Sequence, residues 1–263
     1  MSVLIDCDPT LGRPFSDIDD VLAIVFAQAA GVEIAAVTSV WGNASIGHTT
    51  ATAERITRRF GLPSHRGASG PGDSDTHAAR ALARHTGTVV ALGPLTNVAA
   101  ALDLGARWER LVVLGGTTSD RLNLRPLHTT EFNLAVDRQA AFRVLPHATD
   151  VVLMEPCRQV WFGRTHLAPL PSSLRRGMLP WWATSVLRHG RFGFHPWDVL
   201  AVALLTHPGL FRTTRCGVTL DRSRRRAGRV VLGEGDVRVV HGVDADLLHS
   251  VWFEVIRNAA HDV

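Results

Sequence analysis

Short apolar runs alternate with amphipathic stretches through the first half of the chain. The apolar runs have the length of buried strands and lie at residues 3–8, 34–40, 88–92, 110–114 and 150–154. The stretches between them repeat apolar residues at helical spacing and lie at residues 16–31, 44–60, 95–102 and 137–145. This order predicts an α/β fold, with a mostly parallel, Rossmann-like open sheet and helices on both faces.

The last third of the chain has a different pattern. Helices are expected at 173–189 and 197–205, short strands at 216–220, 229–232 and 237–240, and a terminal helix at 243–259. The last two strands flank Gly233-Glu234-Gly235-Asp236, which is typical of a turn. We therefore expect a small antiparallel strand addition near the C-terminus. Because no linker or repeat interrupts the chain, residues 1–263 are expected to form a single domain.

Composition narrows the class of protein. With 46% hydrophobic and 20% charged residues, the chain is typical of a globular protein. No apolar run approaches the roughly 18 residues of a membrane span, so no membrane partner is expected. The absence of a basic leader and the presence of three cysteines favour the cytoplasm. The net charge is +4, and the densest basic run lies at residues 222–226. Because this run lacks the interleaved aromatic residues of a nucleic-acid-binding segment, we interpret it as a solvated strand edge and expect no nucleic-acid partner.

The strongest chemical signal is a set of aspartates near the N-terminus. Asp6 and Asp8 are at the end of the first strand, two residues apart, so their side chains leave the strand on the same side. Asp19 and Asp20 lie in the first turn of the next helix. Ser16 and Asp19 have the spacing of a capping box at the start of that helix. Converging carboxylates repel one another, and a hard divalent cation with oxygen ligands removes the conflict; Ca²⁺ suits such a set better than Zn²⁺. The alternative is that these acids only cap the helix and bind loop amides.

Two enzyme families begin in this way. Asp6-Cys7-Asp8-Pro9-Thr10 resembles the nucleophile motif of the haloacid-dehalogenase-like phosphatases, which normally also use a lysine, and this chain has none. Asp6-Cys7-Asp8-Pro9 followed by Asp19-Asp20 resembles the opening of the inosine–uridine-preferring nucleoside hydrolases, interrupted here by an insertion at residues 10–18.

Later segments, in the order of the nucleoside hydrolases, favour the second resemblance. They are Gly42-Asn43, Gly93-Pro94-Leu95-Thr96-Asn97, Val112-Val113-Leu114-Gly115-Gly116, Glu131-Phe132-Asn133 and Trp197-Asp198. Each segment is short, but the ordered set covers nearly the whole chain. The resemblance implies the nucleoside hydrolase fold and hydrolysis of the N-glycosidic bond of ribonucleosides to free base and ribose.

The resemblance also implies a metal site. Ca²⁺ would be bound by Asp8, Asp20, Asp198 and the backbone carbonyl of Leu92, with Asp6 supporting the site through water. Asp8 would act as general base on a metal-bound water, which attacks the anomeric carbon of the ribose.

The resemblance assigns further residues to the substrate. The implied substrate-binding set is Asp19, Asn43, Leu114, Glu131 and Asn133. Trp197 resembles a tryptophan that stacks on the base in the purine-preferring branch, so a purine nucleoside is expected. His195 is a second candidate for the acid that protonates the leaving base. Taken alone, the asparagines would suit turns and Trp197 would suit the core.

Three departures from the family pattern leave alternatives open. The insertion at 10–18 adjoins the metal site, and the segment at 64–76 is short where relatives carry a loop over the base. Arg125 falls where the family has an asparagine, which would suit a substrate with an anionic 5′ group. The alternatives are therefore a hydrolase of another N-ribosyl compound and a catalytically weak ribosyl-binding protein. By analogy with relatives, a homo-oligomer (dimer or tetramer) is expected.

Overall fold

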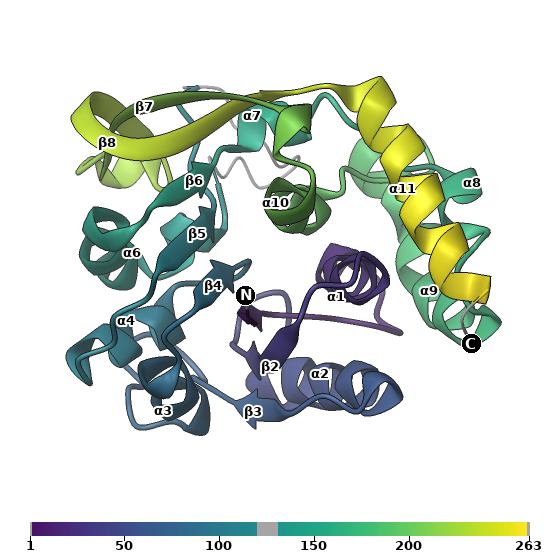
Figure 1. Ribbon diagram of the computed structural model, residues 1–263, viewed down its shortest axis with the longest axis horizontal. Coiled ribbons are helices and arrows are strands. Elements are labelled where there is room, and N and C mark those ends of the chain that lie inside the picture. Colours follow the sequence, from purple (N-terminus) through teal and green to yellow (C-terminus); the bar gives the residue numbers. More distant parts are fainter. Residues whose placement is uncertain (1, 120–130, 262–263) are drawn as a thin grey trace.

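A computed structural model describes residues 2–119 and 131–261 of the chain (Figure 1). These residues form an eight-stranded sheet in the order β3-β2-β1-β4-β5-β6-β8-β7. Neighbouring strands are parallel except for β7 and β8. The strands are β1 (Val3–Cys7), β2 (Ile34–Ser39), β3 (Ser64–Arg66), β4 (Thr88–Ala91), β5 (Arg110–Leu114), β6 (Asp150–Val152), β7 (Phe211–Leu220) and β8 (Val230–Val243). The predicted fold class, including the antiparallel addition, is confirmed.

Helices cover both faces of the sheet (Figure 1). One face is covered by α1 (Asp19–Ala29), α2 (Ile46–Phe60) and α10 (Trp197–Thr206). The helices α9 (Ser172–His189) and α11 (Ala245–His261) extend the same hydrophobic core on the outer side of α1 and α10. The other face packs against α3 (His77–Arg84), α4 (Thr96–Asp103) and α6 (Arg138–Val144). The short elements in the connections are α5 (Asn133–Val136), α7 (Met154–Cys157), α8 (Arg164–Leu167), η1 (Leu145–His147), η2 (Pro208–Leu210) and η3 (Arg224–Arg226).

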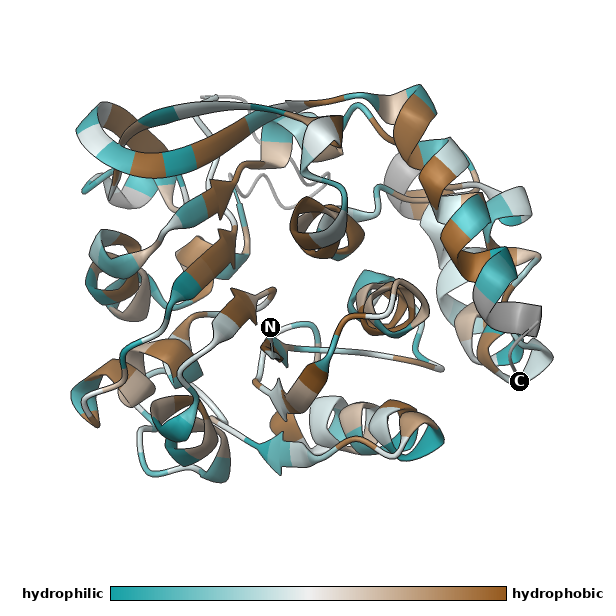
Figure 2. Ribbon diagram, viewed as in Figure 1, coloured by the Kyte–Doolittle hydropathy of each residue, from teal (hydrophilic) through white to brown (hydrophobic). Residues whose placement is uncertain are grey.

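The strands alternate between these two faces. Ile5 and Val90 contribute to one hydrophobic core, whereas their neighbours Leu4 and Val89 contribute to the other. Both sets are buried, which explains why the strands are apolar at nearly every position. Figure 2 shows the same distribution, with apolar residues along the strands and on α10. None of the described helices is both long and apolar enough to cross a membrane.

The predicted turn at Gly233-Glu234-Gly235-Asp236 is wrong. These residues belong to β8, which continues from Val230 to Val243 beside β7. Gly217 pairs with Gly233 while the next residue back, Cys216, pairs with Val237, so the residues between Gly233 and Val237 form a bulge. The long antiparallel partner therefore overrides the local turn signal, and the glycines accommodate the bulge.

Two local predictions are also wrong. The side chain of Ser16 does not cap α1, whose N-cap residue is Ile18; instead Ser16 Oγ donates to the carbonyl of Asn43 at 3.2 Å. The basic run at 222–226 lies in the connection between β7 and β8 rather than at a strand edge, and its last three residues form the 3-10 turn η3. In the segment at 64–76, β3 adds an edge strand that the polar sequence Ser64-His65-Arg66 did not predict.

Candidate functional site

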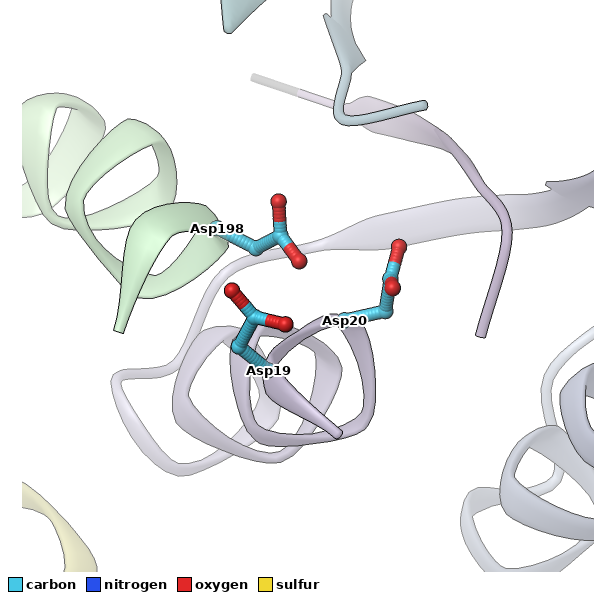
Figure 3. A group of neighbouring side chains, drawn as sticks. All are labelled: Asp19, Asp20 and Asp198. Carbon is cyan, nitrogen blue, oxygen red and sulfur yellow. The ribbon is translucent and has the colours of Figure 1, made fainter. Parts of the chain in front are cut away.

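Three buried aspartates from two helices face one another at the carboxyl end of the sheet. Asp19 and Asp20 lie in the first turn of α1, and Asp198 lies in the first turn of α10. One carboxylate oxygen from each lies within 4.8 Å of the other two, and Figure 3 shows the three side chains as neighbours at the starts of the two helices. Apolar packing of α10 against α1 in the core brings these distant residues together.

Asp8 follows β1 and is joined to this group through Asp20 and Asn43. The backbone N–H of Asp8 donates to Asp20 Oδ1 at 3.1 Å, and the backbone N–H of Asn43 donates to Asp8 Oδ2 at 2.6 Å. Asn43 Nδ2 donates to Asp20 Oδ2 at 3.4 Å. Gly42 permits this close approach, because its φ is +155° and a Cβ there would lie 2.0 Å from Asp8 Oδ2.

Two side chains hold the carboxylate of Asp6, which lies in β1. Its Oδ1 accepts hydrogen bonds from Thr38 Oγ1 at 2.6 Å and from Asn97 Nδ2 at 2.8 Å. Its Oδ2 is buried and has no hydrogen-bond partner in the structure. Burial raises the pKa of Asp6 to about 7 despite these two hydrogen bonds. Asp6 is thus fixed in position with one oxygen available.

Electrostatics make this site suitable for a cation. Burial raises the pKa of Asp8 to about 8, and the hydrogen bond from Asn43 offsets this only in part. Burial, followed by the charges of neighbouring acids, also raises the pKa of Asp19, Asp20 and Asp198 well above the usual value. Within residues 2–119 and 131–261, none of these four forms an ion pair with a basic side chain. An all-oxygen set of unpaired buried carboxylates fits a hard divalent cation.

Glu131 and Asn133 form a second polar group next to the strand ends. Glu131 is buried, and its two oxygens accept the backbone N–H groups of Asn133 at 2.6 Å and Leu134 at 2.8 Å. Asn133 Nδ2 donates to the carbonyls of Leu92 at 2.6 Å and Leu114 at 3.1 Å. Asn133 therefore ties together the ends of β4 and β5, and burial raises the pKa of Glu131 to about 7.

Trp197 and His195 lie beside Asp198 at the start of α10. Trp197 is half-buried, and its ring centroid lies 5.1 Å from that of His195. The Nδ1 atom of His195 lies 2.7 Å from the carbonyl of Val160 and donates a hydrogen bond to it. Burial lowers the pKa of His195, which disfavours the protonated form that a general acid needs.

The insertion at residues 10–18, here called the strap, packs against α9. Trp181 Nε1 donates to Asp17 Oδ1 at 3.0 Å, and the backbone N–H of Phe15 donates to Thr184 Oγ1 at 3.0 Å. Phe15 has a φ of 59° and is the one non-glycine residue with positive φ in the described part of the chain. The strap thus connects α9 to the start of α1, where Asp19 and Asp20 lie.

The structure brings most of the predicted site residues together. Asp19 joins Asp20 and Asp198 in one group of carboxylate oxygens, whereas Asp8 is linked to that group by the hydrogen bond from its backbone N–H to Asp20. Arg125 lies outside the described residues. Asn97 was not among the predicted site residues, yet its Nδ2 donates to Asp6 and its Oδ1 accepts the backbone N–H of Ala68 at 2.8 Å. Its position in the Gly93-Pro94-Leu95-Thr96-Asn97 segment was the available signal.

Comparisons with known proteins agree on one family. The sequence model described as inosine-uridine preferring nucleoside hydrolase matches residues 3–250. A non-specific ribonucleoside hydrolase, RihC, from Salmonella agona is 28% identical, over 88% of this chain and 87% of that protein. A purine-preferring ribonucleoside hydrolase from Gardnerella vaginalis superimposes with a TM-score of 0.82 at 19% identity, covering 100% of both chains. A plant nucleoside hydrolase, PpNRh1, gives a TM-score of 0.80 at 20% identity, covering 97% of this chain and 98% of that one.

Proposed function

Because this chain belongs to the inosine-uridine preferring nucleoside hydrolase family, we propose that it is a Ca²⁺-dependent hydrolase of purine ribonucleosides. Members of this family are glycosidases that cleave N-ribosyl bonds, so the chain is an enzyme of that class. The family match decides against the phosphatase alternative. The observation that carries the proposal of a metal is the buried group of Asp19, Asp20 and Asp198, which lacks a basic partner within the described residues.

Asp8, Asp20, Asp198 and the carbonyl of Leu92 would hold the ion, and Asp6 would support it through water. The links between Asp8 and Asp20, and the partnerless buried Oδ2 of Asp6, support this assignment. When bound, Ca²⁺ would supply positive charge that keeps these acids ionised and lowers the pKa of water. Asp19 is close enough to Asp20 and Asp198 to contribute an oxygen to the ion or to a ribose hydroxyl.

Asp8 is the proposed general base. Asn43 fixes Oδ2 with a 2.6 Å hydrogen bond, so the carboxylate is held in one orientation and Oδ1 is the atom that would accept a proton from water. Asp19, Asn43, Glu131 and Asn133 would bind the ribose hydroxyls. Leu114 would contribute its carbonyl beside that of Leu92, since both accept from Asn133. The carboxylates would also stabilise the positive charge that develops on the ribose in the transition state.

Trp197 is proposed to stack on the departing base. Its half-buried ring directly precedes Asp198, so a base attached to a ribose at the aspartate group would lie near it. A purine offers a larger stacking surface than a pyrimidine. The similarity in fold to the purine-preferring enzyme from Gardnerella vaginalis is consistent with this preference. His195 is the weaker candidate for the leaving-group acid, because burial lowers its pKa.

The test is a reducing-sugar assay on a panel of inosine, adenosine, guanosine, uridine and cytidine, with Ca²⁺ or with a chelator. We expect ribose release from the purine nucleosides, loss of activity with chelator, and a fall of at least 100-fold in Asp8→Asn. The control is Glu54→Gln, which removes an exposed acid on α2 and should leave activity unchanged. Equal rates with and without chelator would contradict the metal requirement.

A second comparison tests the base-stacking role. Trp197→Phe should keep much of the purine activity, whereas Trp197→Ala should reduce kcat for inosine more than for uridine. Equal losses for both substrates would assign Trp197 to packing alone.

Two alternatives have distinct outcomes in the same assay. A hydrolase of another N-ribosyl compound would release ribose 5-phosphate from a 5′-monophosphate faster than ribose from the nucleoside. A weak ribosyl-binding protein would bind nucleosides in calorimetry without turnover. We further propose a single-domain, cytoplasmic enzyme that acts in purine salvage as a homo-oligomer. Its three free cysteines suit a reducing compartment, and light scattering would measure the oligomeric state.

A further inference from the structure

A cavity of about 560 Å³ opens between α8 and α9. None of its lining residues belongs to the aspartate site. Leu167 and Met178 are buried in its floor, and the half-buried ring of Trp182 forms part of the wall. The volume falls within the range of about 300–1,000 Å³ that is usual for small-molecule sites. The cavity can therefore accept a ligand with an apolar part.

The rim of this cavity is positively charged. Arg164, Arg175 and Arg176 line it and are exposed, and none of its lining residues is acidic. Among the described residues, none of the three guanidinium groups forms an ion pair. The segment from Pro156 to Trp197 contains six arginines and no aspartate or glutamate, which is more positive charge than the formal +4 of the whole chain. Three unpaired guanidinium groups around one opening favour an anion.

The walls of the cavity are held in place from outside. At the start of α8, the backbone N–H of Gly163 donates to His166 Nδ1 at 3.0 Å, so the proton of the neutral imidazole ring is on Nε2. This Nε2 atom donates to His249 Nδ1 of α11 at 2.8 Å. On α9, Trp181 binds Asp17 of the strap, as described above. Because both helices are anchored to other elements, little ordering is needed on binding.

We propose that the cavity between α8 and α9 is a binding site for an amphiphilic anion, namely a phosphate ester carried on a short apolar chain. The guanidinium groups of Arg164, Arg175 and Arg176 bind the phosphate oxygens, and the apolar chain packs against Leu167, Met178 and Trp182. This site is separate from the nucleoside site and does not depend on the proposed hydrolysis.

Charge argues against a second copy of this chain as the occupant. Six of the chain's 24 acids are buried at the nucleoside site, so they do not offset the basic surface. They are Asp6, Asp8, Asp19, Asp20, Glu131 and Asp198. Two α9 faces in contact would place like charges together, which is unfavourable, whereas an anionic ligand complements them.

The test is isothermal titration calorimetry of the full chain with octyl phosphate below its critical micelle concentration. Inorganic phosphate and octanol are the comparison ligands, because each lacks one half of the proposed ligand. We expect octyl phosphate to bind at least tenfold more tightly than either comparison ligand. The double variant R175Q/R176Q should bind octyl phosphate at least tenfold more weakly than the wild type does. The matched control R58Q/R59Q removes an exposed arginine pair from α2 and should bind as the wild type does.

Further arms identify the hydrophobic contact and the source of the ligand. Trp182→Ala should lower the affinity for octyl phosphate but not the affinity for inorganic phosphate. Cosedimentation with phosphatidic acid vesicles, absent with phosphatidylcholine and reversed by octyl phosphate, would identify a lipid; binding of octyl phosphate without cosedimentation would identify a soluble ester. Equal affinity for octyl phosphate, octanol and phosphate, or unchanged binding in R175Q/R176Q, would overturn the proposal. Binding needs no turnover, so these results are independent of nucleoside hydrolysis.

Discussion

The aspartate group should destabilise the protein whenever its cation is absent, and Asp198→Asn tests this directly. Asp19, Asp20 and Asp198 are buried, with carboxylate oxygens within 4.8 Å of one another. Burial and mutual repulsion both raise their pKa values, so the folded state pays a cost to hold them together. Asparagine has nearly the same shape as aspartate and removes one charge from the group.

The magnitude follows from the geometry. Two unit charges 4.8 Å apart repel by about 3.5 kcal/mol at an effective dielectric constant of about 20. Partial protonation of the group reduces this repulsion, so we expect the free energy of unfolding to rise by about 1–3 kcal/mol in Asp198→Asn without metal. For a chain of this length, that corresponds to a rise in Tm of roughly 2–10 °C.

The assay is thermal unfolding of the wild type and the variant, each with chelator and with excess Ca²⁺. Ca²⁺ at about 100 times its Kd should stabilise the wild type by about 2.7 kcal/mol, whereas Asp198→Asn should lose most of this gain because it lacks one ligand. The variant should also lose nucleoside hydrolysis. Glu54→Gln, on the exposed side of α2, is the charge-matched control and should change neither value.

Two results would refute the reasoning. One is an Asp198→Asn variant that is less stable than the wild type in chelator, since this would mean that the carboxylate stabilises the metal-free fold. The other is an equal Ca²⁺-induced rise in Tm for both proteins, which would place the cation elsewhere.

Three further predictions concern other parts of the molecule. Gly42→Ala places a Cβ 2.0 Å from Asp8 Oδ2 and should lower kcat at least 100-fold, whereas Gly47→Ala, with no atom within 4 Å of the new Cβ, should leave it unchanged. Asp150→Asn should lower the free energy of unfolding by about 2–4 kcal/mol at pH 7, because the buried carboxylate accepts hydrogen bonds from Arg110 and Arg238. Burial opposes ionisation of Asp150, but these arginines hold its pKa below the usual value. Its contribution is therefore present above about pH 4 and is lost as pH falls through this lowered pKa. Urea unfolding should show the stabilities of the two proteins converging as pH falls below about 4, with Asp236→Asn as the exposed control. Phe15→Gly should be about 1 kcal/mol more stable than Phe15→Ala, since both lose the exposed ring but only glycine relieves the positive φ; equal melting temperatures would show that the strap is unstrained.

Much of the fold could be predicted because its strands are buried on both faces. β1, β4 and β5 are near-continuous apolar runs, and their expected bounds agree with the structure within one residue. β3 was missed because Ser64-His65-Arg66 is a polar edge strand with no hydrophobic signal. The bulge in β8 was mistaken for a turn because glycines serve both structures, and only pairing with β7 distinguishes them.

The sequence by itself determined the composition of the candidate site. Asp6 lies near the end of β1, Asp8 directly follows that strand, and Asp19 and Asp20 begin a helix, so local periodicity alone places four acids at the carboxyl edge of the sheet. Tertiary structure decided which oxygens meet: Asp198 reaches Asp19 and Asp20 because α10 packs against α1 in the core. It also placed the strap against α9 and the arginines around one cavity. Such contacts depend on how apolar helix faces fit together, which no local spacing along the chain encodes.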